Sequence, residues 1–235
     1  MHTSAYKTAG QFFKIYATIG SKLSVLEIGS QNVNGTLRDH ITPQISKYTG
    51  VDFVSGNGVD IVLEDPYKYP FPDNHFDIVV TSSCLEHSEL FWLTWLEAIR
   101  VLKPSGILYT NAPSAWMDYH RYPVDCWRFW PDAAKALETW GQRNGYSCMT
   151  LETFIVPPAP DQDNADWASV FLKDSAYCFL YQKRIIDTLI PYTDFMNGFR
   201  FPNNTKFPHG WEHPVARYHM ATKKNNVIWT KGLIY

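Results

Sequence analysis

Residues 111–137, NAPSAWMDYHRYPVDCWRFWPDAAKAL, form the part of the chain that is richest in side chains able to do chemistry. Charged, imidazole and aromatic groups alternate there: Trp116, Asp118, Tyr119, His120, Arg121, Tyr122, Asp125, Trp127 and Arg128. Aromatic rings stack on the C–H faces of sugars, whereas carboxylates and guanidinium groups hydrogen-bond hydroxyls. The segment therefore predicts a binding site for a small polyhydroxylated ligand. The alternative is an interface or core loop whose Asp and Arg side chains pair with each other.

Three residues are candidates for a general base at such a site. His120 is the first choice, because an unperturbed imidazole titrates near neutrality. His87, in TSSCLEHS, and Asp125 are its rivals. For His87 a structural role at the start of a helix is an equally good interpretation.

A second candidate site lies around VLEIGSQNVNG, residues 25–35, where an apolar strand runs into a glycine turn. Glycine lets the backbone approach a ligand closely. The pattern is not GxGxxG, because only Gly29 and Gly35 are present, so a dinucleotide diphosphate is disfavoured. The acidic Glu27 instead suits a cationic group, such as the amino group of a methionine moiety. An ordinary strand, turn and helix is the alternative.

Acidic residues also follow the next two expected strands. Asp52, in TGVD, could accept both hydroxyls of a ribose, as acidic residues do in dinucleotide folds. Its alternative role is a strand-end cap. Asp65 could accept from an adenine amino group, with Glu64 as the fallback. Pro66 lacks the backbone N–H that often accompanies such an acid.

Alternating apolar strands and helical segments predict an α/β fold with a doubly wound, mostly parallel sheet. The expected strands are 22–30, 46–54, 59–63, 75–83, 107–113, 147–156 and 166–173. The expected helices are 3–20, 35–46, one after a Ser88 cap, and one from Pro131 to Gly141. The last two strands predict an antiparallel edge hairpin. We expect one domain over 1–174 and an irregular extension over 175–235, which could act as a lid, substrate contact or oligomer contact.

Composition narrows the class of protein. The chain has 235 residues, is 45% hydrophobic and carries a net charge of −2, so it lacks the overall basic charge of a nucleic-acid binder. It has neither a signal-peptide pattern nor an apolar run of membrane-spanning length, which favours a cytoplasmic location without a membrane span. Four scattered Cys without CxxC spacing disfavour zinc. His209, Glu212 and His213 lie close in sequence but lack HExxH spacing, so we expect no metal.

Four segments within about residues 22–114 resemble the type 11 class I methyltransferases. They are VLEIGS, GVD, YPFPDNHFDIVVTSSCLEH and IRVLKPSGILYTNAPS. The resemblance implies a Rossmann-like seven-stranded sheet with S-adenosylmethionine (SAM) as cofactor. It places Glu27, Gly29 and Ser30 at the methionine part, Asp52 at the ribose, Asp65 at the adenine, and Ser82 and Ser83 beneath the sulfonium. The predicted donor site is completed by Gln31, Gly35, Phe53 and Glu64. Departures from the family are the missing middle glycine and LKPSG in place of LKPGG.

HRYPVDCWRF followed by PDA also resembles a subset of these methyltransferases found among sugar- and polysaccharide-modifying enzymes. It implies O-methylation of a small acceptor, with a sugar hydroxyl or glycan as the first choice and a homodimer as a further candidate. A protein or nucleic-acid methyltransferase is the alternative, although TSSC replaces the Asn/Asp-Pro-Pro-aromatic motif of amino-directed DNA enzymes. A SAM-binding domain without catalysis stays open, and the missing GxGxxG disfavours a NAD protein.

Overall fold

Nine strands form one continuous sheet in the computed structural model, which describes residues 3–114, 118–158, 164–190, 195–201 and 205–206. Their order across the sheet is β3-β2-β1-β4-β5-β7-β6-β8-β9. The strands are β1 Leu23–Ile28, β2 Ile45–Asp52, β3 Ile61–Val62, β4 Phe76–Ser82, β5 Leu102–Pro113, β6 Met149–Val156, β7 Asp166–Leu172, β8 Met196–Arg200 and β9 Thr205–Lys206.

The first five strands are parallel, and their carboxyl ends meet at one edge of the sheet. Ile28 at the end of β1 is level with Val51 of β2 and Thr81 of β4. Thr81 is level with Thr110 of β5. In open α/β sheets, ligands bind in the crevice outside these carboxyl ends. The register therefore gathers the residues after β1, β2 and β4 into one place.

The remaining strands are antiparallel and confirm the predicted edge hairpin. β7 lies between β5 and β6 and runs antiparallel to both. The sheet then continues past the hairpin, because β8 pairs with β6 and β9 pairs with β8. The α/β fold class is confirmed, and two short strands extend the seven that the sequence predicts.

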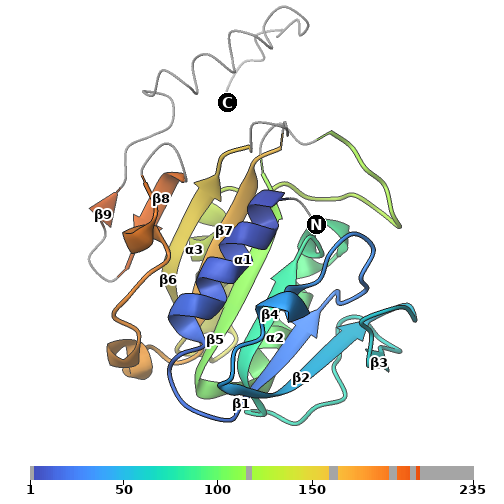
Figure 1. Ribbon diagram of the computed structural model, residues 1–235, viewed down its shortest axis with the longest axis horizontal. Coiled ribbons are helices and arrows are strands. Elements are labelled where there is room, and N and C mark those ends of the chain that lie inside the picture. Colours follow the sequence, from blue (N-terminus) through green and yellow to red (C-terminus); the bar gives the residue numbers. More distant parts are fainter. Residues whose placement is uncertain (1–2, 115–117, 159–163, 191–194, 202–204, 207–235) are drawn as a thin grey trace, which may run out of the picture.

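Helices cover both faces of the sheet (Figure 1). Helix α1, Thr3–Tyr16, lies on one face, and α2, Phe91–Val101, and α3, Asp132–Arg143, lie on the other. Each face has its own buried apolar cluster, one containing Phe12 of α1 and the other containing Trp95 of α2. In the part of the chain that the structure describes, no helix has the length and apolar character needed to cross a membrane.

The helix expected at 35–46 is absent, which corrects that prediction. A short 3₁₀ helix, Leu37–His40, stands there, and Thr36 caps it by accepting the Arg38 N–H at 3.2 Å. β2 already begins at Ile45. Pro43 supplies no N–H and disfavours helical geometry in the residue before it, so a longer helix cannot continue into this strand.

Two expected helix ends are also corrected. Leu90, not Ser88, precedes the first residue of α2, and the Ser88 hydroxyl bonds the Thr94 hydroxyl at 2.8 Å instead. Gly141 lies inside α3, which continues to Arg143. A Cβ at Gly141 would lie 2.5 Å from the Cys148 sulfur, so this glycine provides close packing and does not end the helix.

Candidate active site

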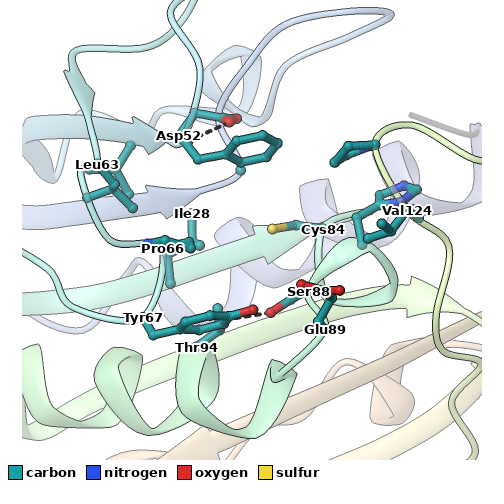
Figure 2. Close-up of a pocket in the computed structure, with 15 residues that line it drawn as sticks. Ile28, Asp52, Leu63, Pro66, Tyr67, Cys84, Ser88, Glu89, Thr94 and Val124 are labelled. Atoms are coloured by element: carbon teal, nitrogen blue, oxygen red, sulfur yellow. Dashed lines mark hydrogen bonds between the residues drawn. The ribbon is translucent and has the colours of Figure 1, made fainter.

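A cleft of about 360 Å³ opens at the carboxyl ends of the parallel strands (Figure 2), and its volume falls in the range of small-molecule sites. Residues from the ends of β1, β2, β3 and β4, from α2 and from the loop after β5 line it. They are Ile28, Gly29, Val51, Asp52, Phe53, Leu63, Pro66, Tyr67, Cys84, His87, Ser88, Glu89, Thr94, Pro123 and Val124. The cleft thus contains four of the residues predicted for the site: Gly29, Asp52, Phe53 and His87.

Gly29 forms the floor where β1 ends. Its φ of 74° lies in the left-handed region, which glycine adopts at little cost. A Cβ there would lie 2.7 Å from both Cβ and Sγ of Cys84. The N–H groups of Gly29 and Ser30 both donate to the Val51 carbonyl, at 3.0 and 3.1 Å. The glycine therefore holds the turn after β1 tightly between β2 and β4.

Asp52 is buried at the tip of β2 and also lines the cleft. Its Oδ2 accepts the Gln31 N–H at 3.1 Å, and its Oδ1 accepts the Phe53 N–H at 2.8 Å and the Val54 N–H at 3.4 Å. Asp52 thereby fixes the turn that follows β1. A carboxylate has about four acceptor sites, so it can still receive a ligand hydroxyl.

Glu27 lies in β1 but is not among the lining residues. It is 4% exposed, and its carboxylate accepts from the Tyr48 hydroxyl at 2.9 Å. Burial raises the pKa of Glu27 from 4.5 to about 7, and the Tyr48 hydrogen bond partly opposes this. Ser30 is likewise buried, and its side chain lies against Gly50.

The other residues predicted for the donor surround the cleft without lining it. The Gly35 N–H donates to the Asn32 side chain at 3.0 Å. Glu64 and Asp65 are exposed, and Asp65 accepts the Tyr67 N–H at 2.8 Å. Ser82 and Ser83 turn toward β5: the Ser82 hydroxyl donates to the Asn111 side chain at 3.4 Å, and the Ser83 N–H donates to the Asn111 carbonyl at 3.0 Å. Their contacts with a donor stay predictions.

A mostly apolar wall begins beside Asp52, where the Leu63 N–H donates to the Asp52 carbonyl at 2.7 Å (Figure 2). Leu63, Pro66 and Tyr67 form it, and the Tyr67 hydroxyl accepts the Leu90 N–H at 3.3 Å. Phe53 beside Asp52 is 49% exposed. An acidic group next to apolar and aromatic surfaces fits a nucleoside, whose ribose is polar and whose base is flat.

His87 forms the end of the cleft that lies after β4. Its Nδ1 donates to the Val124 carbonyl at 2.5 Å, which leaves Nε2 without the proton. Its ring meets that of His120 at a centroid distance of 5.2 Å and an angle of 89°. Burial lowers the pKa of His87, which favours the neutral ring.

Glu86, a residue for which no role was predicted from the sequence, stands beside these two imidazoles. Its Oε1 is 3.7 Å from His87 Nε2, whereas its Oε2 is buried and makes no hydrogen bond among the described residues. Burial raises the pKa of Glu86 to about 8. The signal available in the sequence was the Glu-His pair directly after the strongly apolar strand.

Asp125 holds the loop after β5 in place. Arg128 bonds its carboxylate with both terminal nitrogens, at 2.5 and 2.8 Å, and the His120 backbone N–H donates to it at 2.8 Å. The hydrogen bonds from Arg128 hold the pKa of Asp125 well below its usual range. This Asp–Arg pair is the pairing considered above as an alternative. It makes Asp125 a positioning residue for His120.

The remaining residues predicted for the acceptor divide into two groups. Trp127 is packed against Phe91, and its indole N–H donates to the Ser88 carbonyl at 3.0 Å. Asp118, Tyr119, Arg121 and Tyr122 are exposed. Trp116, together with the tail residues His209, Glu212 and His213, lies outside the described residues.

Comparisons with known proteins agree with this geometry. Residues 9–110 match the family model described as a methyltransferase domain. A chloroplastic 2-methyl-6-phytyl-1,4-hydroquinone methyltransferase 1 of Oryza sativa subsp. japonica is 30% identical over 124 residues, which are 52% of this chain and 36% of the rice protein. The chain thus spans about a third of the length of this curated relative.

Two solved structures are similar in fold. YcgJ of Bacillus subtilis aligns with a TM-score of 0.56 at 16% identity, over 72% of this chain and 99% of YcgJ. The 1,6-didemethyltoxoflavin-N1-methyltransferase of Burkholderia thailandensis, solved with S-adenosylhomocysteine, aligns with a TM-score of 0.57 at 16% identity, over 74% of this chain and 79% of that protein. The family match thus makes residues 9–110, under half of the chain, similar to methyltransferase domains, and the solved structures show that the fold is shared.

Proposed function

We propose that this protein transfers a methyl group from SAM to an oxygen of a small polar acceptor. The observation that carries the proposal is the arrangement of the cleft, in which Asp52 and an apolar wall form one part and His87 forms the other. Asp52 would accept the ribose hydroxyls, and Phe53, Leu63 and Pro66 would enclose the adenine. SAM supplies a methyl group already activated on a sulfonium, so the protein's task is to position the two reactants and receive a proton.

The acceptor's proton would be lost at the pair of imidazoles. His87 and His120 each have Nδ1 bonded to a backbone carbonyl, at 2.5 Å to Val124 and 3.1 Å to Asp118, and Nε2 remains for the acceptor. Asp125 is a poor base, because Arg128 keeps it ionised and hydrogen-bonded. His120, which is the more exposed of the two rings, is our first choice for contact with the acceptor.

A sugar hydroxyl is the acceptor that the exposed loop favours. Tyr119 and Tyr122 are 71% and 74% exposed, and the exposed, charged residues Asp118 and Arg121 each directly precede one of them in sequence. Free aromatic faces next to hydrogen-bonding groups suit a polyhydroxylated ring. The name of the rice relative gives a second acceptor class, a hydroquinone, which the apolar residues Pro123 and Val124 at the cleft would suit.

Calorimetry followed by a methyl-transfer assay tests the proposal. We expect SAM and S-adenosylhomocysteine to bind and NAD not to bind, and we expect methyl transfer to a member of a panel containing nucleotide sugars, free sugars and hydroquinones. His120→Ala should retain SAM affinity and lower turnover by about 10²-fold or more. His75→Ala, at the amino end of β4, serves as the control. NAD binding without SAM binding would refute the proposed activity, and unchanged turnover in His120→Ala would remove His120 from it.

A further inference from the structure

Three potential metal ligands converge at the end of the cleft formed by the residues after β4. Glu86, His87 and His120 each offer one ligand atom, and the three atoms lie within 4.8 Å of one another. Glu86 and His87 belong to the 3₁₀ helix Leu85–His87, and His120 comes from the loop after β5. Because His87 lines the cleft, the cluster borders the space proposed for the acceptor.

The hydrogen bonds around the two imidazoles leave the same nitrogen available on each ring. Nδ1 of His87 donates to the Val124 carbonyl, and Nδ1 of His120 donates to the Asp118 carbonyl. A backbone carbonyl bonded to one ring nitrogen fixes the tautomer and orientation that a metal-binding histidine needs at the other nitrogen. The two rings are therefore arranged to coordinate through Nε2.

Glu86 gives an independent reason to place a cation here. It is 1% exposed, and its Oε2 has no hydrogen-bond partner among the described residues. A buried carboxyl oxygen without a partner is costly, and in native structures such a group is explained by strain, a catalytic role, a water molecule or an ion. The nearby Arg128 does not meet this need, because both of its terminal nitrogens bond Asp125.

Hydrogen bonds hold the loop that carries His120 in position. None of them uses the proposed ligand atoms of Glu86, His87 and His120. The His120 N–H donates to Asp125 at 2.8 Å, and the Cys126 N–H donates to the Glu86 carbonyl at 2.7 Å. The Trp127 indole donates to the Ser88 carbonyl at 3.0 Å. This scaffold connects the loop after β5 to the segment after β4, so the ligand geometry exists before any ion binds.

We propose that Glu86, His87 and His120 bind a divalent transition-metal ion. Two imidazoles and one carboxylate suit Zn²⁺, Mn²⁺, Co²⁺ or Fe²⁺ better than Mg²⁺ or Ca²⁺, which prefer all-oxygen sites. Three protein ligands leave coordination positions open. The proposed metal binding does not depend on the proposed methyl transfer. In a further step, which rests on the proposed methyl transfer, both Nε2 atoms would be ligands and would no longer act as bases, and the ion would hold the acceptor oxygen and ease loss of its proton to water.

Titration calorimetry of the full-length, chelator-treated protein with ZnCl₂, repeated with MnCl₂, tests the site. We expect one Zn²⁺ per chain, with affinity reduced by about 10-fold or more in Glu86→Gln and in His120→Gln. Co²⁺ loading gives a second readout, because visible absorption bands of a low-coordinate site should appear in the wild type and be lost in both variants. Glu86→Gln keeps the shape of the side chain, and S-adenosylhomocysteine binding by the same sample shows that the cleft is intact.

Two control variants distinguish this cluster from other histidines. His75→Gln should leave Zn²⁺ binding unchanged, as should a His209→Gln/His213→Gln double variant in the tail. Absence of Zn²⁺ binding in a protein that binds S-adenosylhomocysteine would overturn the metal site and leave the proposed function standing. Binding that survives Glu86→Gln and His120→Gln would also overturn it. Failure to bind S-adenosylhomocysteine with Zn²⁺ binding intact would count against the proposed function alone.

Discussion

Two carboxylates near neighbouring strand tips occupy different environments. Asp52 accepts three backbone N–H groups and lines the cleft, whereas Glu27 is buried behind the cleft with the Tyr48 hydroxyl as a hydrogen-bond partner. Burial raises the pKa of Glu27 to about 7. The residue therefore weakens the fold where it is ionised.

Glu27 should make the stability of the protein depend on pH. The unfolded chain loses this proton near the ordinary value of 4.5, but the folded chain retains it up to about pH 7. The contribution of Glu27 to stability is therefore most favourable below pH 4.5 and declines as the pH rises from 4.5 to about 7, by about 3 kcal/mol at most. We expect Glu27→Gln to remove this decline, so the variant should be more stable than the wild type at pH 8 and nearly equal to it at pH 5.

Thermal unfolding at the two pH values measures the difference, with the exposed Glu64→Gln as the control. The glutamine oxygen can still accept from Tyr48, so a packing defect is not expected. If Glu27 meets the cationic amino group of the donor, the same variant should bind SAM more weakly while folding more stably. An equal shift in unfolding midpoint at pH 5 and pH 8 would contradict the assignment of the effect to ionisation.

The composition of the site was partly predictable from local sequence. Gly29, Asp52 and His87 follow apolar strands, and parallel strands end at one edge, so their meeting could be inferred. Glu86 could not be inferred in the same way. Glu86 lies beside His120, which is more than thirty residues further along the chain. Its burial depends on the loop that carries His120, and no local pattern encodes these contacts.

At the scale of elements, packing holds the turn after β1 in position. The expected helix does not follow this turn. Gly29 fits between β2 and β4 with no room for a Cβ, and the Gln31 N–H is bonded to Asp52. The helix predicted at 35–46 failed because Pro43 stands two residues before β2. Strands were easier to predict than this connection, because β1 and β4 are mostly apolar, as is typical of buried parallel strands.

Gly29→Ala should therefore damage both the fold and the proposed donor site. The added Cβ would meet Cys84 at 2.7 Å, and alanine would be strained at a φ of 74°. We expect a loss of about 2–4 kcal/mol in unfolding free energy, with SAM affinity reduced by about 10-fold or more.

Gly145→Ala is a matched control for this variant. Its φ of 88° imposes a similar backbone strain, but a Cβ there would meet nothing within 4 Å. It should cost about 1–2 kcal/mol and leave SAM affinity unchanged. Equal losses of stability in the two variants would show that packing against Cys84 contributes nothing.

At the scale of the whole molecule, the segment after β7 is bonded to the sheet. Glu152 of β6 accepts the Tyr16 hydroxyl from α1 at 2.6 Å and the N–H groups of Ile185 and Ile186 at 2.9 and 3.0 Å. The Arg184 guanidinium is buried and donates to the Leu151 carbonyl at 3.1 Å. The first helix, the sheet and residues 185–186 thus share one buried carboxylate, and the domain boundary at residue 174 stays a prediction.

The sequence could not indicate this connection, because residues 175–190 show neither helical nor strand periodicity. Their buried side chains, including Tyr181, Ile185 and Ile186, join the same cluster as Phe12 of α1. This apolar packing and the hydrogen bonds that distant groups make to Glu152 together explain why the segment packs where it does. One substitution, at Glu152, can therefore test whether this segment unfolds together with residues 1–174.

Glu152→Gln should lower the stability of the whole molecule in a single transition. Three donors converge on two carboxylate oxygens, and the glutamine amide would turn a donor toward at least one of them, at a cost of about 2–4 kcal/mol. The exposed Glu89→Gln should change little. Amide exchange at Ile185 and at Val25 of β1 is the decisive measurement, because residues of one cooperative unit lose protection together. Loss of protection at Ile185 alone would mean that the segment opens as an extension separate from residues 1–174.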